Sequence, residues 1–508
     1  MKKVIVNCLR AYQRWQAAFL YGTILLVVIV SIPLHLGDPT PDVSWLITMC
    51  ERIWNGEIAY VDVFETTPPV PMLLYMPGVI LSQLTGLTAE AITIAFAYAA
   101  GLFSLGLSAR ILPHFYADGG RSRWLILLPA SIVLFVLPND AFAQREYFAA
   151  AFALPIVAVF YRHADQGTWP TLVDRVLAAA LAGIMIAIKP PLFVIPGLVL
   201  AAFYWWRTRS LLFLFSSGLF AAGVFGLMIT AASFVAFPHY LGEISTVMRD
   251  VYIPVRNHPL VFLNDKACLG TLSCLGLVLL LSAQQKPPAG VIPIILVAIG
   301  FLITYFIQGK FFPYHVYPAA LFTAIAACIM VCRRMISYTA GPTVRLAGAS
   351  GVYGLALAGI SVLFLVGFDD RRPIMSDLSW ASALDRPTAL AISPDIATAF
   401  PLARRIGAVW VDRSHSQWVA KYSRNALQSG GLGEADIKKF HRYSNNDLER
   451  ILRRIKEKVP EIIIQDVRYQ NSALAAELAV LSKSNFLQDY EPIAEQGGIR
   501  ILRRLQSR

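Results

Sequence analysis

Long apolar segments joined by short basic connections constrain this 508-residue chain more than any other feature. Hydrophobic residues make up 56% of the sequence and charged residues only 15%. A soluble protein of this length needs far more polar surface, so the sequence predicts a polytopic α-helical membrane protein. We expect about 11 membrane-spanning helices, with about 13 as the upper limit. They are predicted near residues 17–36, 88–112, 124–138, 147–162, 175–188, 191–207, 210–237, 268–283, 290–308, 315–332 and 344–367.

Two apolar stretches are not predicted from length alone. The first, Ala17–Leu36, follows a basic N-terminus, is long for a signal-peptide core and has no small-residue cleavage site after it. It is therefore predicted to be a retained first helix. The second, residues 69–87, contains three prolines that disfavour one regular helix. We expect an interfacial or re-entrant element there.

Basic residues between the spans predict the orientation of the chain. With the N-terminus in the cytoplasm, the short cytoplasmic connections carry mostly lysine and arginine, as the positive-inside rule expects. An odd number of spans then places the C-terminal segment in the periplasm of a bacterial inner membrane. The net charge of +12 is explained by these connections, so no nucleic-acid partner is expected.

Charge density divides the sequence into two predicted domains. Residues 369–508 hold 22 of the 44 lysines and arginines and 17 of the 32 acidic residues. Residues 1–368 are thus predicted to form a transmembrane domain, and residues 369–508 a small soluble α/β domain. Strands are expected at "TALAIS", "AVWVDR" and "EIIIQDV", a helix at "NDLERILRRIKEKVP", another near 473–482, and a final strand pair joined at Gly497–Gly498.

The first periplasmic loop, residues 37–69, is acidic and aromatic. Apolar residues from Leu46 to Trp54 recur at helical spacing, which predicts an amphipathic helix along the membrane interface. The loop also holds the carboxylates that are candidates for chemistry, namely Asp38, Asp42, Asp62 and Glu65.

Other polar residues are predicted to reach the same face of the membrane. They follow or precede spans and are Arg145 and Glu146 in "NDAFAQREYF", Lys189 in "IKPPLF", and Lys310, Tyr314 and His315 in "QGKFFPYH". Acids, cations and aromatic rings gathered at one water–membrane boundary suit a lipid-linked anion.

Each of these residues also has a plainer interpretation. Lys189 can snorkel at a helix C-terminus, and His315 can be a hydrogen-bonded packing residue. Asp62 and Glu65 can solvate the loop or cap a turn, and Asp42 can be the N-cap of the interfacial helix. Arg145 and Glu146 can form a structural ion pair.

The first loop carries a recognisable pattern: an early Asp42, a helix, then Gly56, Tyr60 and Asp62 in G-x-x-x-Y-x-D spacing, and Pro-Pro after "FETT". With its many spans, the chain resembles glycosyltransferases of the GT-C superfamily, which use polyprenyl-phosphate sugars. The similarity is greatest to the branch of protein O-mannosyltransferases and lipid A aminoarabinose transferases. That branch commonly has Lys-Pro-Pro where this chain has Thr67-Pro68-Pro69.

The resemblance implies an inverting glycosyltransferase of EC class 2.4 with its active site on the periplasmic face. Asp42 matches the family's catalytic aspartate by position, with Asp38 as second choice, and would take a proton from the acceptor hydroxyl. Because the loop lacks the family's lysine, we expect Lys189, Arg145 or Lys310 to hold the donor phosphate.

The remaining candidates are expected to bind substrate: Asp62, Glu65, Glu146, Tyr314 and His315. No cofactor is certain, but some branches use a divalent metal ion, and the loop carboxylates Asp38, Asp42, Asp62 and Glu65 are suitable ligands. The expected partners are a polyprenyl-phosphate-linked sugar donor, membrane lipid, and a glycan, lipid or protein acceptor.

Two other functions fit a protein of this class. A glycolipid flippase or transporter would carry charged residues near the centres of several spans and show paired halves, neither of which is clear here. An O-antigen-type polymerase or ligase would share the lipid donor but transfer a whole glycan.

Overall fold

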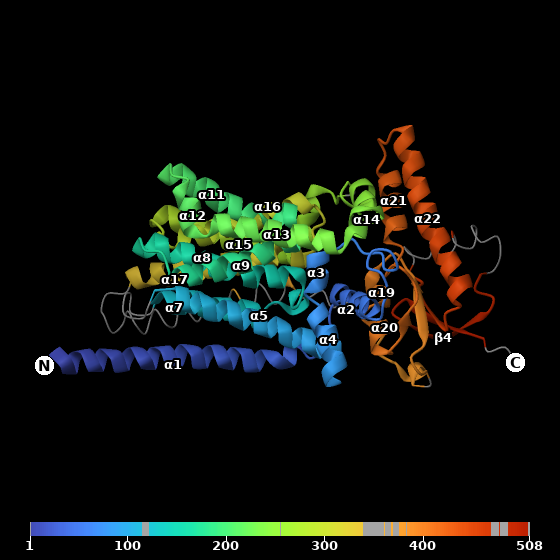
Figure 1. The fold of residues 1–508 in the computed structure, drawn as a ribbon, viewed down its shortest axis with the longest axis horizontal. Coiled ribbons are helices and arrows are strands. Elements are labelled where there is room, and N and C mark those ends of the chain that lie inside the picture. Colours follow the sequence, from blue (N-terminus) through green and yellow to red (C-terminus); the bar gives the residue numbers. More distant parts are fainter. Residues whose placement is uncertain are drawn as a thin grey trace. The chain divides into compact units, whose positions relative to one another are not determined.

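The computed structural model describes residues 2–113, 121–254, 256–338, 360, 367–368, 375–382, 384–468, 477 and 486–505. The chain forms two compact units, each assembled from segments that are distant in sequence (Figure 1). The helical unit comprises Met1–Gly37, Thr93–Ser233 and Asn257–Asp370. The sheet unit comprises Asp38–Ile92, Phe234–Arg256 and Arg371–Arg508. The sheet unit thus includes the first predicted loop, whereas the sequence predicts one division near residue 368.

The helical unit is built from long apolar helices. Its helices, long and short, are α1 (Lys2–His35), α5 (Ala89–Ile111), α7 (Arg121–Phe135), η1 (Asn139–Ala141), α8 (Arg145–Gln166), α9 (Leu172–Ile188), α10 (Pro190–Phe193), α11 (Ile195–Thr208), α12 (Leu212–Ser217), α13 (Leu219–Ala236), η4 (Pro259–Asn264), α15 (Lys266–Gln284), α16 (Val291–Gln308) and α17 (Pro313–Tyr338). The first residues of α5 and the last of α13 belong to the sheet unit.

Eight helices among the described residues are long and apolar enough to cross a membrane. Together with shorter apolar helices, they confirm the predicted class of polytopic helical membrane protein. The predicted spans at 124–138 and 175–188 correspond to the shorter helices α7 and α9. The predicted span at 344–367 lies outside the described residues, apart from Ile360 and Gly367.

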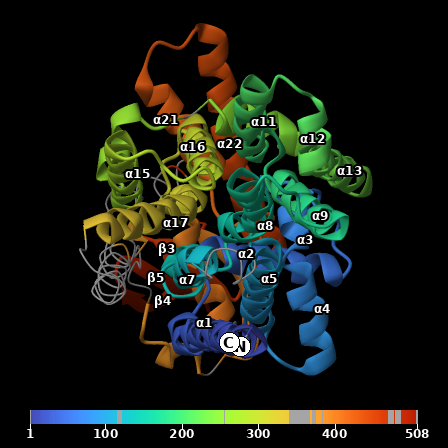
Figure 2. The same ribbon diagram turned by 90° about the vertical axis from the view of Figure 1, so that its left-hand side faces the viewer.

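Small residues let the helices of this unit approach closely. Helix α17 packs against α7, α8, α15 and α16 (Figure 2). It is the most enclosed of the candidate spans among the described residues. Gly183 of α9 faces Phe225 and Gly226 of α13, where an added Cβ would lie only 2.5 Å from the Phe225 Cβ. Without water to drive helix association, such close backbone packing is a main source of stability within a bilayer.

The sheet unit combines a five-stranded sheet with helices from three parts of the chain. Its elements are α2 (Pro41–Trp54), α3 (Pro69–Leu73), α4 (Met76–Thr85), η2 (Pro238–Leu241), α14 (Glu243–Val247), η3 (Met248–Tyr252), η5 (Ser379–Ala381), β1 (Thr388–Ile392), α19 (Ile396–Ala399), α20 (Leu402–Arg405), β2 (Val409–Trp410), α21 (Trp418–Ser429), α22 (Glu434–Lys458), β3 (Ile462–Asp466), β4 (Tyr490–Gln496) and β5 (Ile499–Arg504).

The strand order is β2-β1-β3-β5-β4. Strands β2, β1 and β3 are parallel, and β5 and β4 continue the sheet antiparallel. Alternate residues face opposite sides, as the period of a strand requires. Leu390 and Ile463 pack with α22 residues such as Ile451, while Ala391 and Ile464 share a core with residues of α2. The predicted strands and the helix before "EIIIQDV" are therefore confirmed; the helix predicted at 473–482 lies outside the described residues, apart from Glu477.

The first predicted loop is folded into this sheet unit. Helix α2 is present as expected, but all eight residues from Val43 to Cys50 are buried, including Thr48 on its predicted polar face. The apolar stretch 69–87 is broken into α3 and α4, in agreement with its prolines. The loop thus supplies one of the two layers that cover the sheet.

Candidate active site

Three of the predicted site residues meet inside the helical unit. Glu146 lies in the first turn of α8, Lys189 between α9 and α10, and His315 near the start of α17. The ammonium group of Lys189 donates a hydrogen bond to Glu146 Oε1 and another, 2.9 Å long, to Gln308 Oε1. His315 Nε2 is 3.6 Å from the same Glu146 oxygen. Glu146 is fully buried, and the side chains of Lys189 and His315 are 15% and 4% exposed.

The local sequence explains why Lys189 points inward. The residue ends α9, and Pro190 and Pro191 then begin the short helix α10, whose Phe193 ring lies 5.7 Å from the lysine Nζ. The ammonium group is therefore held between the Phe193 ring and the Glu146 carboxylate.

Two further cations belong to this region. Arg145 precedes Glu146 in α8, and Lys310, 5% exposed, follows α16. Both act electrostatically on His315, as does Lys189. The Lys310 carbonyl accepts a 2.7 Å hydrogen bond from the Asn257 side chain, which connects this segment to the loop before α15. All three predicted phosphate-binding cations thus lie in one part of the helical unit.

Two buried atoms of the cluster have no hydrogen-bond partner among the residues that the structure describes. They are Glu146 Oε2 and His315 Nδ1. Since buried polar atoms are almost always hydrogen-bonded, a pair of unsatisfied atoms beside a lysine is typical of a place where a ligand or water binds. Tyr314 lies beside it, with its ring 4.7 Å from that of His315 in an edge-on contact.

Asp42, the predicted catalytic base, belongs to the sheet unit. Helix α2 begins at Pro41 and Thr40 is its N-cap, so the interpretation of Asp42 as the N-cap is wrong; the proline starts the helix two residues earlier than that interpretation requires. Asp42 is partly buried and acts electrostatically on His415 and Tyr422. Burial raises the pKa of Tyr422 to about 12, and the charge of Asp42 adds to the shift.

Glu65 lies in a buried network of the same unit. It accepts hydrogen bonds from the Trp45 indole, at 2.5 Å, and from the Thr67 backbone N–H, at 2.7 Å. The His415 ring packs edge-on against Trp45, and its Nδ1 is 2.8 Å from Ser416 Oγ. Burial lowers the pKa of His415, although nearby carboxylates act in the opposite direction. Glu65 thus closes a turn, as one alternative predicted, and it also orients Trp45.

The other two loop carboxylates have local partners. Asp62 accepts a 2.8 Å hydrogen bond from the Ile58 N–H, which closes the turn from Ile58 to Asp62. Asp38 lies 3.3 Å from Arg405 Nε. Burial raises the pKa of Asp38, and the positive charge of Arg405 opposes this shift. These contacts give both residues a structural role, and their roles in catalysis or binding stay predictions.

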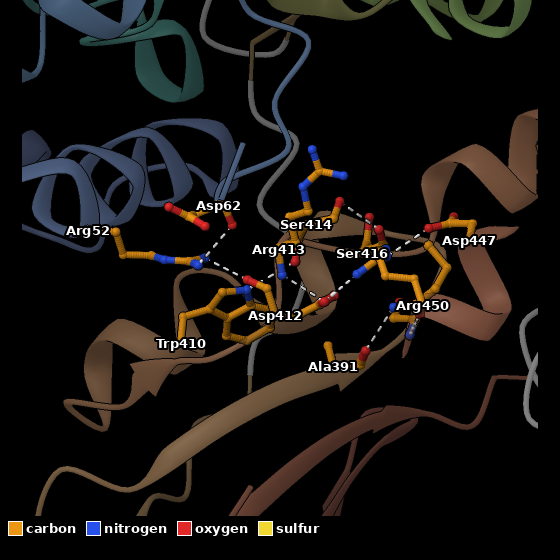
Figure 3. Close-up of polar contacts among 12 residues, drawn as sticks. Arg52, Asp62, Ala391, Trp410, Asp412, Arg413, Ser414, Ser416, Asp447 and Arg450 are labelled. Carbon is orange, nitrogen blue, oxygen red and sulfur yellow. Dashed lines mark hydrogen bonds and ion pairs between the residues drawn. The ribbon is translucent and has the colours of Figure 1, made fainter. Parts of the chain in front are cut away.

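A network of arginines ties the first loop to the C-terminal segment within the sheet unit (Figure 3). Arg52 donates to the Asp412 carbonyl at 2.6 Å and to the Asp62 carbonyl at 3.2 Å. Arg450 of α22 pairs with the side chains of Asp412 and Asp447. The sequence did not single out Asp412 or Arg450. Asp412 follows strand β2 at the carboxyl end of a parallel sheet, which is a position where polar side chains commonly gather.

No metal site is formed by the described residues: nowhere among them do three His, Cys, Asp or Glu side chains gather closely enough to hold an ion. Asp38 and Asp62, two of the predicted ligands, instead face Arg405 and a backbone N–H. The predicted ligands therefore do not gather in this arrangement, and metal dependence stays a prediction.

Comparison with known proteins supports the fold. No protein-family model matches the chain, and no curated protein matches it. The crystal structure of ArnT from Cupriavidus metallidurans in the apo state is similar, with a TM-score of 0.55 and 15% sequence identity over 96% of this chain and 98% of that chain. ArnT is a lipid A aminoarabinose transferase of the GT-C family. The predicted architecture, with many spans and a small C-terminal sheet region, is thereby confirmed, and the likeness to ArnT is one of fold.

Proposed function

We propose that this chain, whose fold is that of the glycosyltransferase ArnT, transfers a sugar from a polyprenyl-phosphate donor to a glycan, lipid or protein acceptor. The observation that carries the proposal is the buried cluster of the helical unit, in which Glu146 contacts both Lys189 and His315 while Arg145 and Lys310 lie nearby. A polyprenyl phosphate leaves with negative charge, and cations fixed in a site of low polarity stabilise such charge strongly.

The proposed step is a single displacement at the anomeric carbon. The acceptor hydroxyl forms a new bond to this carbon as the bond to the phosphate oxygen breaks, which inverts the configuration. Asp42 takes the hydroxyl proton as general base. The bonding electrons leave with the phosphate, whose charge is held by Lys189, Arg145 or Lys310. Glu146 then keeps the lysine ammonium in position, because an ion pair fixes its orientation.

The proposal includes an orientation and a location. We place the N-terminus in the cytoplasm and residues 369–508 in the periplasm of a bacterial inner membrane, since the short connections rich in Lys and Arg then lie inside. The acceptor would meet the donor on the periplasmic face.

The proposal can be tested with Asp42→Asn in a deletion strain. Envelope glycans would be compared by mass spectrometry after complementation with wild-type protein or the variant at matched membrane levels. We expect a one-sugar mass increment with wild type, and a rate reduced about 10²–10⁴-fold in the variant, the usual contribution of a general base. Asp385→Asn is the matched control, because Asp385 is an exposed residue of the same unit.

Three outcomes would contradict the proposal. An increment restored equally by Asp42→Asn removes Asp42 as the base, and Asp38→Asn and the double variant then test the second candidate. Transport of a glycolipid by purified protein in liposomes, without any change in mass, identifies a flippase. An increment of a whole glycan unit identifies a polymerase or ligase.

A further inference from the structure

A cleft of about 440 Å³ lies within the sheet unit. One wall is formed by α14 and the residue before it, and the opposite wall by α22 from Arg442 to Arg450. Phe64 of the first loop, Arg413 and Val419 complete the lining. The volume is in the range of pockets that hold small molecules. The proposed sugar transfer does not use these walls.

One face of α22 carries the polar groups of the cleft. Arg442, Asn446 and Arg450 are spaced four residues apart, so they lie in one row along the helix. Arg450 is the last of the three along the chain, and it contacts Asp412 and Asp447 (Figure 3). Because its guanidinium is occupied by two carboxylates, Arg450 shapes the cleft rather than offering a free charge.

Arg413 is occupied as well. It donates to both carboxylate oxygens of Glu243, at 3.1 and 2.7 Å, and to the Val61 carbonyl at 2.6 Å. Its guanidinium also lies 5.2 Å from the centre of the Phe64 ring. The Glu243 side chain is still 55% exposed, so it can accept hydrogen bonds from a ligand's hydroxyl groups.

Arg442 differs from Arg413 and Arg450 in its contacts. It is exposed, lies 5.8 Å from the centre of the Tyr443 ring, and forms no ion pair with the residues that the structure describes. An arginine fork matches the two oxygens of a carboxylate or phosphate. Asn446, one turn along, is exposed and offers both a donor and an acceptor.

We propose that this cleft binds a saccharide that carries a phosphate or carboxylate group, with Arg442 holding the anion and Asn446 and Glu243 holding hydroxyl groups. Phe64 and Tyr443 supply the apolar surface that a sugar ring needs on its C–H face. A site for a simple anion would not need groups that bind hydroxyls, and a site for a lipid chain would have a more apolar lining than this cleft. The site therefore goes beyond the proposed transfer, and its binding can be measured without any donor.

The test uses the full-length protein in nanodiscs of zwitterionic lipid and ligand-observed NMR. The probes are glucose 1-phosphate, glucuronic acid, neutral glucose, inorganic phosphate and an acidic dipeptide. We expect the two anionic sugars to bind more tightly than the other three. Arg442→Gln should weaken their binding about tenfold, the scale of one charge-assisted pair.

Two variants make this test specific. Arg453→Gln removes the same charge from an exposed position of α22 that does not line the cleft, and should leave binding unchanged. Asn446→Ala should weaken the binding of the sugars and leave that of inorganic phosphate unaltered. Equal effects of Arg442→Gln and Arg453→Gln would overturn the proposal, as would equal binding of the dipeptide or inorganic phosphate.

A second arm identifies the source of the saccharide. Glucuronosyl diacylglycerol included in the nanodiscs should compete with free glucuronic acid if the cleft takes lipid head groups. Lack of competition would instead support a soluble glycan as the occupant. If the wild-type protein adds no sugar in the complementation assay while its binding of the anionic sugars is intact, this counts against the proposed function and not against this site.

Discussion

The helical unit and the sheet unit bury charged side chains in different ways. In the helical unit, Lys189 contacts Glu146, yet Glu146 Oε2 and His315 Nδ1 have no hydrogen-bond partner among the described residues. In the sheet unit, the Arg404 guanidinium is held by Glu51, Glu90 and Thr48. Networks of this second kind join segments that lie more than 300 residues apart in the sequence.

This difference distinguishes a ligand-binding site from a cluster of charges that stabilises the fold. An unsatisfied buried polar atom costs about 1–3 kcal/mol, so two of them beside a buried lysine are consistent with a bound ligand or water. A saturated guanidinium holds its neighbours in place and has little capacity left for a substrate. The sheet unit has exceptions, such as Asp412 Oδ2, but its arginine contacts are mostly saturated. This contrast favours the helical unit's cluster as a place where a ligand binds.

The largest effect is expected from Lys189→Gln. The variant should lower the rate of sugar transfer about 10²–10³-fold, because a cation held beside developing charge in a buried site is lost. The rate would be measured with purified protein, and Lys266→Gln, at an exposed position in the same unit, is the control. A Lys189→Gln/Glu146→Gln double variant should regain stability without regaining activity. Recovery of transfer in the double variant would show that the cluster is only structural.

A smaller effect, on stability, is expected from Arg404→Gln. This variant leaves Glu51 and Glu90 without their partner and should destabilise the sheet unit by about 2–3 kcal/mol. That is below the cost of breaking a fully buried pair, because both carboxylates keep some exposure. Arg405→Gln, which breaks the more exposed pair with Asp38, should cost less than about 1 kcal/mol. Chemical unfolding of the full chain, followed by tryptophan fluorescence, measures the stability of both variants. Equal losses of stability would contradict the difference expected between the buried ion pairs of Arg404 and the more exposed pair of Arg405.

The smallest effect concerns His415 and pH. Burial holds its pKa below the ordinary value of 6.5, although the carboxylates of Glu65, Asp42, Asp395 and Asp447 oppose the shift. The unfolded chain therefore binds the proton more readily, so stability should fall as the pH drops from about 7.5 through 6.5.

His415→Gln should flatten this dependence, as measured by unfolding at several pH values. His441→Gln, at an exposed position of α22, is the matched control and should not flatten it. A steeper loss of stability in the His415 variant at low pH would show that the four carboxylates dominate over burial.

The candidate site in the helical unit was partly predictable. Arg145, Lys189 and His315 stand out because each lies at the end of an apolar run on the same predicted side of the membrane. Their pairing was not predictable, since α8, α9 and α17 are separate in sequence and only the packing of the bundle brings Glu146, Lys189 and His315 together. In the sheet unit, nothing local marked Arg404 or Arg450 as partners of distant carboxylates.

The sequence by itself determined the class of the protein, because apolar runs long enough to span a bilayer and alternating strand patterns are local properties of the chain. It also determined the break between α3 and α4, where prolines prevent a continuous helix. Only the tertiary structure decided that the polar face of α2 is covered, with Thr48 and Glu51 bound by Arg404. Burial of a charge depends on which segments fold together, and no local pattern records a contact between residues about 350 positions apart.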